Sequence, residues 1–544
     1  MRGDRRVWLA SAALIGLLGA VAVVFRPPNH DVSWYLHMAS VMLNGGTAYV
    51  DVVDTNPPLI VMLTMVPVWT ARLAGLAPTE AFYGGVFLLG VLSCVWCGRL
   101  IVRAWPGASG AAHGLLAAAV VFLLLAFPKG DFGQREHLTV ILAMPYVLAA
   151  AVRSIGGSLS RGEAILAGVA GAIGFALKPH FLLAWAAVEI ALLVRARIRA
   201  GSSRRAPALA NSRADSPEPW RRRLRAEFLA ALFTVAAYGV AILVVFPEYV
   251  GVARRVWAVY GGLDSPTARL LALREWQIGL VALALVALVR LPRDLAGPLS
   301  IVGAAAAGFL ASSLLQLKGW GYHMLPAQVF LALLFLVLVV SVIQATPALA
   351  GFIRGGSTAI MAAIAIMLTM LSVKYVYEAR QRVPNDTLTP LAALVREHAP
   401  DGPIAVLGMR TLVYPAFPLV NQTGVRWSLR HHSLWFLPAF YEAELRAPGA
   451  MQALRTPAQM PPLERAFYDE IIGDLCAVPP RLLIIERASP LAPAGRRALD
   501  LESYYGQDAR FARLFGAFRV QSDVGPFMVY KAIAPPVCSS GAAR

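Results

Sequence analysis

The chain has 544 residues, of which 58% are hydrophobic and only 15% are charged, and its mean hydropathy is +0.61. Soluble domains are about 45–50% apolar and about 25% charged, so this composition excludes a soluble globular protein and indicates a polytopic membrane protein. The formal net charge of +18 indicates arginine-rich cytoplasmic loops, and we expect no nucleic-acid partner.

Up to about residue 373, apolar stretches alternate with short polar loops. A membrane-spanning helix needs about 20 consecutive apolar residues. The sequence predicts about eleven transmembrane helices, at residues 7–25, 82–98, 112–127, 138–152, 164–177, 181–194, 227–246, 276–289, 298–315, 325–345 and 357–373.

One further apolar stretch, Leu59–Leu76, is ambiguous, and the distribution of basic residues decides its place. If it lies on the outer surface, the loops on the N-terminal side carry 20 basic residues and the opposite loops carry 10. Ten of those 20 are the arginines from Arg195 to Arg225. If the stretch crosses the membrane, this arginine-rich loop moves outside. The positive-inside rule favours the first arrangement, so we expect residues 374–544 outside the cytoplasm.

The sequence predicts two domains, a transmembrane domain at 1–373 and a soluble α/β domain at 374–544. The second has the composition of a soluble protein and short strand-like runs at Ile404–Leu407, Leu482–Ile485 and Phe527–Tyr530. Cys476 and Cys538 can pair if this domain faces an oxidising compartment. Its aromatic and basic residues between 426 and 436 form either a packed core or a surface that stacks on a glycan, and the core is favoured.

The first outer loop is not a simple connector. Asp31 directly follows the first span, and Asp51 and Asp54 come just before Asn56-Pro57-Pro58. These last two acids either cap a turn or bind a substrate. Between Asp31 and Gly45-Gly46, helical spacing of apolar residues predicts an amphipathic helix in the membrane interface, formed by Trp34, Tyr35, Met38, Val41 and Met42.

Charged residues also gather at other outer borders of the predicted spans. The second outer loop carries the acids Asp131 and Glu136. Basic and aromatic residues lie at two further borders, in Lys178-Pro179-His180 and in Lys318 to His323. Taken singly, such an acid is typical of a solvated loop and such a lysine of an interfacial anchor. Together, they suit an enzyme whose substrate is a lipid-linked phosphate.

The first outer loop resembles that of the GT-C glycosyltransferases, and most closely the protein O-mannosyltransferase-like and lipid A aminoarabinose transferase-like groups. The similar residues are Asp31-x-x-x-Tyr35, Ala39, Leu43-x-Gly-Gly-x-x-Tyr49-x-Asp51 and Asn56-Pro-Pro-Leu59. The resemblance covers the layout of roughly residues 1–375 and is sharp only within 30–60. Two departures are Thr55-Asn56, where the family often has a lysine, and a lone first acid without an acidic neighbour.

The resemblance implies an all-α polytopic GT-C-like membrane protein with a C-terminal extracytoplasmic α/β domain. Its activity would move a sugar from a polyprenyl-phosphate-linked donor to an envelope glycan, lipid or protein acceptor, on the outer face of a bacterial inner membrane. The lone acid weakens the case for a divalent metal, because hard cations prefer several oxygen ligands. The sequence establishes no cofactor, and a divalent metal stays an open alternative.

The resemblance also implies roles for single residues. Asp31 matches the first-loop catalytic acid, and Asp131 or Glu136 matches the second-loop acid, with Glu136 favoured because it adjoins the span. Asp51 and Asp54 would bind acceptor hydroxyls or a weakly held metal. The lipid phosphate would be bound by Lys178, Lys318, Tyr322 and His323.

The alternative is a membrane transporter or flippase of a lipid-linked or envelope substrate. A transporter typically has ionisable residues inside its membrane spans. The sequence places only Glu189 deep in one, within 181–194, and the ionisable residues of the predicted outer side lie at the borders of spans instead. The sequence also has no P-loop and no GxGxxG after a strand, so a nucleotide-dependent mechanism is not indicated.

Reporter fusions test the predicted topology. Because ten arginines favour the cytoplasm for the loop from Arg195 to Arg225, a fusion at Ser203 should report the cytoplasm and one at Asp401 the outside. Activities of paired cytoplasmic and exported reporters at each site measure this. The same side for both fusions would contradict the topology.

Overall fold

The computed structural model describes residues 2–25, 28–205, 225–260, 293–316, 318–345, 356–381, 387–409, 415–441, 454–487 and 499–538. The chain divides into two compact units, each built from segments far apart in sequence. Unit 1 comprises Met1–Arg26, Phe82–Ala241 and Ser265–Gln381, and unit 2 comprises Pro27–Ala81, Ile242–Asp264 and Arg382–Arg544. We describe each unit by itself.

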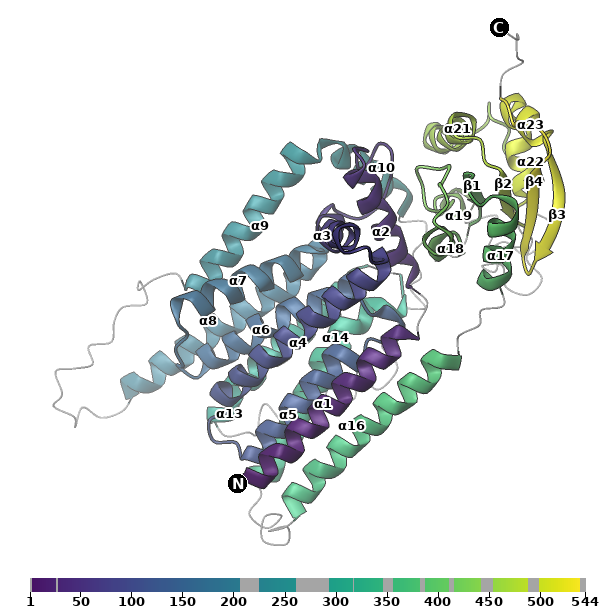
Figure 1. Cartoon of the computed structure of the whole chain (residues 1–544). Helices are drawn as coiled ribbons and strands as arrows, with labels where there is room; N and C mark the ends of the chain where they lie inside the picture. The colour runs from purple at the N-terminus through teal and green to yellow at the C-terminus, as the bar shows by residue number, and fades with distance from the viewer. Residues whose placement is uncertain are drawn as a thin grey trace, which may run out of the picture. The chain divides into compact units, whose positions relative to one another are not determined.

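Unit 1 is helical (Figure 1). Its helix α1 packs against α5 and α16, and α6 packs against α7 and α13. The bounds of the helices are α1 (Arg2–Val24), α4 (Pro78–Ala104), α5 (Gly110–Val121), η1 (Phe122–Ala126), η2 (Lys129–Asp131), α6 (Arg135–Ser154), α7 (Arg161–Ala176), η3 (Pro179–Phe181), α8 (Leu182–Arg205), α9 (Ala226–Val245), α13 (Arg293–Leu315), η5 (Gly321–Met324), α14 (Leu325–Ala345) and α16 (Gly356–Gln381).

An integral membrane protein is confirmed by these helices. In the described part of the chain, seven are long and apolar enough to cross a membrane: Val7–Val24, Pro78–Ala104, Arg135–Ser154, Ala226–Val245, Ala296–Leu315, Gly321–Ser341 and Ala359–Gln381. Every predicted span except one coincides with a helix; the exception, 276–289, lies outside the described residues. The number eleven therefore stays a prediction.

Small residues let the helices of unit 1 approach closely. A Cβ atom added at Gly308 in α13 would lie 2.4 Å from the Cα atom of Ala184 in α8. One added at Gly171 in α7 would lie 2.7 Å from the Cβ atom of Tyr146 in α6. Backbone contact of this kind is how helices associate in lipid, where burial of apolar surface supplies no driving force between them.

Unit 2 joins three helices from the outer loops to the C-terminal region. The loop helices are α2 (His30–Leu43), α3 (Leu59–Ala74) and α10 (Pro247–Tyr260). The C-terminal elements are α17 (Leu388–His398), β1 (Ile404–Leu407), α18 (Ala416–Thr423), α19 (Leu437–Phe440), α21 (Pro462–Ala477), β2 (Leu482–Glu486), α22 (Leu501–Gly506), α23 (Ala509–Phe515), β3 (Phe518–Val524) and β4 (Phe527–Ala532). The predicted boundary at 373 stays a prediction, and the structure adds the two outer-loop segments to the C-terminal region.

The C-terminal sheet has the strand order β1-β2-β4-β3 (Figure 1). β1 and β2 pair in parallel, with Ile404 opposite Leu482, whereas β4 runs antiparallel to both of its neighbours. The three predicted strands are confirmed. The sequence did not indicate β3, an edge strand whose middle residues are largely exposed. Cys476 and Cys538, which the sequence left as a conditional pair, form a disulfide.

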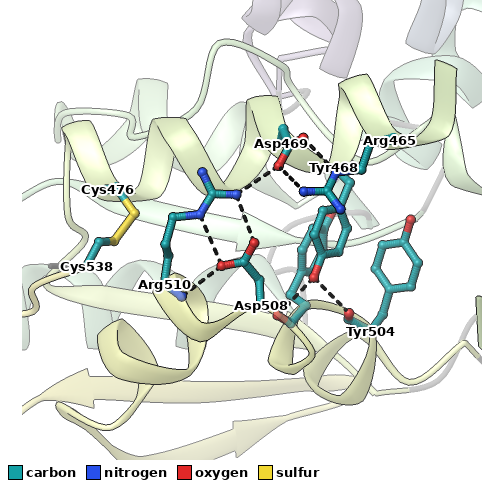
Figure 2. A network of polar contacts seen from close by, with 9 residues as sticks. Arg465, Tyr468, Asp469, Cys476, Tyr504, Asp508, Arg510 and Cys538 are labelled. Atoms are coloured by element: carbon teal, nitrogen blue, oxygen red, sulfur yellow. Dashed lines mark hydrogen bonds and ion pairs between the residues drawn. A yellow bond between two sulfur atoms is a disulfide. The ribbon is translucent and has the colours of Figure 1, made fainter. Parts of the chain in front are cut away.

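A charged network holds the last helices together (Figure 2). Asp469 of α21 accepts from Arg465 at 2.7 Å and pairs with Arg510 of α23 at 2.8 Å. The same guanidinium pairs with Asp508 at 2.8 Å, and beside it Tyr468 donates to backbone carbonyls of α22. These pairs tie α21, α22 and α23 to one another on the sheet.

Helix α3, the ambiguous apolar stretch, packs one face against α2 and exposes the other. Its Arg72 donates to the carbonyl oxygens of Ser40 and Leu43 at the end of α2, at 3.2 and 3.4 Å. The exposed face carries an apolar stripe of Met62, Val66, Trp69 and Leu73. Such a stripe supports a place along the membrane surface, which stays a prediction.

Glu470 of α21 joins two segments of unit 2. Its carboxylate lies 2.5 Å from the guanidinium of Arg255 in α10 and 3.0 Å from Nε2 of His431. Burial by itself raises the pKa of Glu470, but the hydrogen bonds and charges of His431 and Arg255 outweigh it and lower the pKa to about 2. In the unfolded chain, the pKa of this carboxyl has its ordinary value of 4.5. The charged carboxylate therefore contributes its full stabilisation to unit 2 at pH values above 4.5.

Glu470→Gln should consequently lower the stability of the protein at pH 7. Wild type gains about 2–3 kcal/mol from this carboxylate at pH 7 and loses it as the pH falls from about 4.5 towards 2. Melting temperatures at pH 7 and pH 3 measure the effect: the gap between the two proteins should narrow at pH 3. Glu397→Gln, at an exposed site, is the control. An equal gap at both pH values would contradict the prediction.

Candidate functional site

A buried ion pair lies among the helix ends of unit 1. Lys178, just before η3, places its Nζ atom 2.5 Å from Oε1 of Glu136 in the first turn of α6. The same Nζ donates to Oε1 of Gln316 at 3.2 Å. Glu136 is fully buried and Lys178 is 5% exposed. Burying either charge alone is strongly unfavourable, so the two fix each other's position.

Further cations converge on the histidines beside this pair. Lys178 lies 5.5 Å from the ring centre of Tyr322, which contacts the ring of His323 at 4.4 Å. Lys178, Arg135 and Lys318 all lie close enough to His323 to interact with its charge. Burial, followed by the charges of Lys178 and Arg135, lowers the pKa of His180 to about 3. We call Arg135, Glu136, Lys178, His180, Lys318, Tyr322 and His323 the cationic cluster.

Several buried polar atoms around the cationic cluster have no hydrogen-bond partner among the residues that the structure describes. They include both ring nitrogens of His323, both amide atoms of the Gln134 side chain, Nε2 of His180 and Oγ of Ser312. Buried polar atoms are normally paired, so these atoms indicate a bound polar ligand or water. Gln134 also begins α6, whose first amides and dipole favour an anion.

The second outer loop is fastened to its flanking helices by His137. Nδ1 of His137 accepts from the amide of Gly133 at 3.0 Å, and Nε2 donates to the carbonyl of Leu124 at 2.7 Å. Leu124 lies in the π-helical turn η1, and Gly133 adopts a φ of 82°. Asp131 lies on this loop and is partly exposed, whereas Glu136 is part of the cationic cluster. The catalytic roles of both acids stay predictions.

Asp31 lies in the first turn of α2, in unit 2. The side chain of Asn29 caps this helix by accepting from the amide of Asp31 at 2.9 Å. The carboxylate of Asp31 lies 3.4 Å from Nε2 of His30, and its side chain is 16% exposed. A carboxylate in the first helical turn is stabilised by the helix dipole. The predicted interfacial helix after Asp31 is present, and its role in the interface stays a prediction.

The two other acids of the first outer loop form local hydrogen bonds. Asp51 accepts from the amide of Thr47 at 2.7 Å. Asp54 is buried and accepts from the amide and the side chain of Asn56, at 3.1 and 2.8 Å. Both carboxylates thus stabilise the turns before Pro57-Pro58. Their predicted role in substrate binding stays a prediction.

The described residues do not fit a divalent metal. Within them, no group of three or more His, Cys, Asp or Glu side chains lies close enough together to hold an ion. Hard cations prefer several oxygen ligands, and the described residues do not bring such a set together.

The aromatic and basic residues between 426 and 436 are packed inside unit 2. Phe436 stacks on Phe467 at 4.2 Å, and Arg430 forms a bidentate pair with Asp474. Trp427 and Trp435 are each 6% exposed. The favoured interpretation of this stretch as a core is therefore supported, and a flat glycan-stacking surface is absent from these described residues.

Three members of the site were not predicted: Arg135, Gln134 and His180. The sequence did indicate polar residues at these borders of the predicted spans, in Gln134-Arg135-Glu136-His137 and in Lys178-Pro179-His180. Sequence alone does not show that α6, η3, α13 and η5 bring these borders together. Glu189, the residue that favoured a transporter, accepts from Tyr146 at 2.5 Å and pairs with Arg225.

Comparison of the sequence with protein-family models and with curated proteins finds no match. Among solved structures, the chain is similar to ArnT from Cupriavidus metallidurans bound to undecaprenyl phosphate, with a TM-score of 0.57 and 14% identity over 98% of both chains. It also matches the Archaeoglobus fulgidus oligosaccharyltransferase with a TM-score of 0.46 and 11% identity, over 95% of this chain and 80% of that chain. A further match is the arabinofuranosyltransferase AftD from mycobacteria, with a TM-score of 0.44 and 14% identity, over 98% of this chain and 40% of that chain.

The similarity to ArnT extends over nearly the whole of both chains, and at this identity it shows a common fold. The resemblance recognised in the first outer loop is confirmed at that level. The chain therefore has the same fold as ArnT.

Proposed function

We propose that this protein transfers a sugar from a polyprenyl-phosphate-linked donor to an envelope glycan, lipid or protein acceptor on the extracytoplasmic face of a bacterial inner membrane. The observation that carries the proposal is the cationic cluster. It combines three cations with a single acid, and buried polar atoms of His323 and Gln134 beside it have no partner among the described residues. Lysine and arginine side chains at a helix N-terminus suit a phosphate.

The cationic cluster would stabilise the leaving group. In the transfer, the acceptor hydroxyl oxygen attacks the anomeric carbon while the bond from that carbon to the phosphate oxygen breaks. The bonding electrons remain on the phosphate, which gains negative charge as the sugar departs. Lys318, Arg135 and Lys178 would stabilise this charge, and stabilisation that grows in the transition state accelerates the reaction.

Asp31 would accept the proton of the acceptor hydroxyl. A capped helix fixes its backbone, and its carboxylate is partly exposed, so a substrate can reach it. The oxygen atom of a general base that accepts the proton must lie within hydrogen-bond distance of the attacking hydroxyl oxygen. The disulfide between Cys476 and Cys538 supports an extracytoplasmic place for the C-terminal region, because such bonds persist in oxidising compartments.

Lys318→Gln tests the phosphate site. Loss of a charge-assisted hydrogen bond of about 1.5–3 kcal/mol should raise the donor KM about tenfold to a hundredfold. Steady-state kinetics with a polyprenyl-phosphate-sugar measure this. Lys318 is preferable to Lys178, whose removal would leave the buried Glu136 without its cation. Lys374→Gln, at an exposed site, is the matched control. An unchanged donor KM in Lys318→Gln would place the phosphate elsewhere.

Asp31→Asn tests the base. The amide is nearly isosteric with the carboxylate but cannot accept the proton, so turnover should fall about a hundredfold to ten-thousandfold while donor KM stays unchanged. Single-turnover assays on purified protein measure the chemical step. Asp401→Asn, at an exposed position, controls for loss of charge. Turnover within a few fold of wild type in Asp31→Asn would contradict the role of Asp31 as the base, and absence of sugar transfer by the wild-type protein would contradict the proposed reaction.

A further inference from the structure

Helix α2 is attached to the C-terminal region through Trp34, one turn after Asp31. Trp34 is 1% exposed. Its ring packs edge-on against Phe417 of α18, at 4.9 Å between centroids, and against His432, at 5.3 Å. We call Trp34, Phe417 and His432 the aromatic clasp. Because residues three apart share one face of a helix, the clasp lies on the side of α2 that carries Asp31.

Backbone hydrogen bonds flank the aromatic clasp on both sides. The side-chain amide of Asn421 donates to the carbonyl of Ser33 at 3.0 Å. After α2, the amide of Val53 donates to the carbonyl of Arg430 at 2.8 Å. The first outer loop is thus fixed at two points to the C-terminal region, one beside Asp31 and one beyond α2.

The C-terminal side of the aromatic clasp is itself rigidly supported. Arg430 binds both oxygens of Asp474 in α21, and His431 bonds to Glu470 in the same helix. The ring of His432 is oriented by a 2.9 Å contact between Nδ1 and Oγ of Ser433. The loop that presents His432 therefore has little freedom to move relative to α21.

His432 lies close to Asp31 without forming an ion pair with it. Burial is the main cause that lowers the pKa of His432, to about 3, while the charge of Asp31 acts in the opposite direction. His432 is therefore neutral at pH 7. The neutral ring contributes to the site through its packing against Trp34.

We propose that the C-terminal domain orients Asp31 for catalysis through the aromatic clasp, with Trp34 and His432 as positioning residues. The inference rests on the proposed function, in which Asp31 is the base. A base displaced by about 1 Å loses on the order of a hundredfold in rate. The clasp determines where the first turn of α2 lies, and it is assembled from segments that only the folded C-terminal domain brings together.

Kinetics of clasp variants test the inference. Trp34→Leu and His432→Ala should lower kcat about tenfold or more and change donor KM by less than about threefold, because the geometry of the base is altered and the donor site is not. Trp34→Phe and His432→Phe keep an aromatic ring and should recover most of the turnover. Phe511→Leu removes a buried ring of α23 in the same domain, and it should lower the melting temperature without lowering kcat.

A double-mutant cycle separates positioning from general damage. If His432 acts through Asp31, His432→Ala should cause no further loss in an Asp31→Asn background. A multiplicative loss in that background would overturn the inference, as would clasp variants with wild-type kcat beside an inactive Asp31→Asn. Full turnover of Asp31→Asn would remove the base on which the inference rests, whereas absence of sugar transfer by the wild-type protein would overturn the proposed function. Melting temperatures identify any variant that fails to fold, and the loss of kcat is then measured in the other of Trp34→Leu and His432→Ala.

Discussion

Inside a bilayer, a peptide backbone has no water to bond with, and this constraint organises the whole chain. Each segment that crosses the membrane must satisfy its amides and carbonyls as a helix. The helices can therefore carry few polar side chains along their length, and polar side chains gather where helices end. The buried pair of Lys178 and Glu136 shows the result, because it joins the ends of two helices of unit 1. The same ends bring together the other members of the cationic cluster.

Unit 2 stabilises short helices from the loops between membrane spans. Short helices such as α2, α3 and α10 have too little surface to fold alone, and they are stabilised by packing on a domain with its own sheet. Tyr49 of the first loop packs on Phe246 beside α10, and Glu470 of the C-terminal region pairs with Arg255 of α10. A loop that carries a catalytic acid gains rigidity in this way without a longer helix.

The sequence predicted the elements far better than their meeting points. Hydropathy locates the spans. The strands β1, β2 and β4 each contain four consecutive buried apolar or aromatic residues, so each is visible as a run in the sequence. The edge strand β3 is largely polar and exposed, and it leaves no such pattern. Acidic, basic and aromatic residues gather together at the outer borders of the predicted spans, and this made four residues recognisable: Asp31, Glu136, Lys178 and Lys318. The place of His180 in the cationic cluster, and of Gln134 beside it, depends on packing between helices far apart in sequence, and no local sequence pattern indicates that packing.

The bond between Asn421 and Ser33 links residues 388 positions apart. Ribosomes add about 5–20 residues per second, so roughly 20–80 s pass between the synthesis of α2 and the arrival of its partner. During that interval Trp34 has neither Phe417 nor His432 to pack against. The first outer loop can therefore reach its final structure only after the helices between α2 and α18 have been inserted into the membrane. If the aromatic clasp acts as proposed, a chain that is still being synthesised has no catalytic activity.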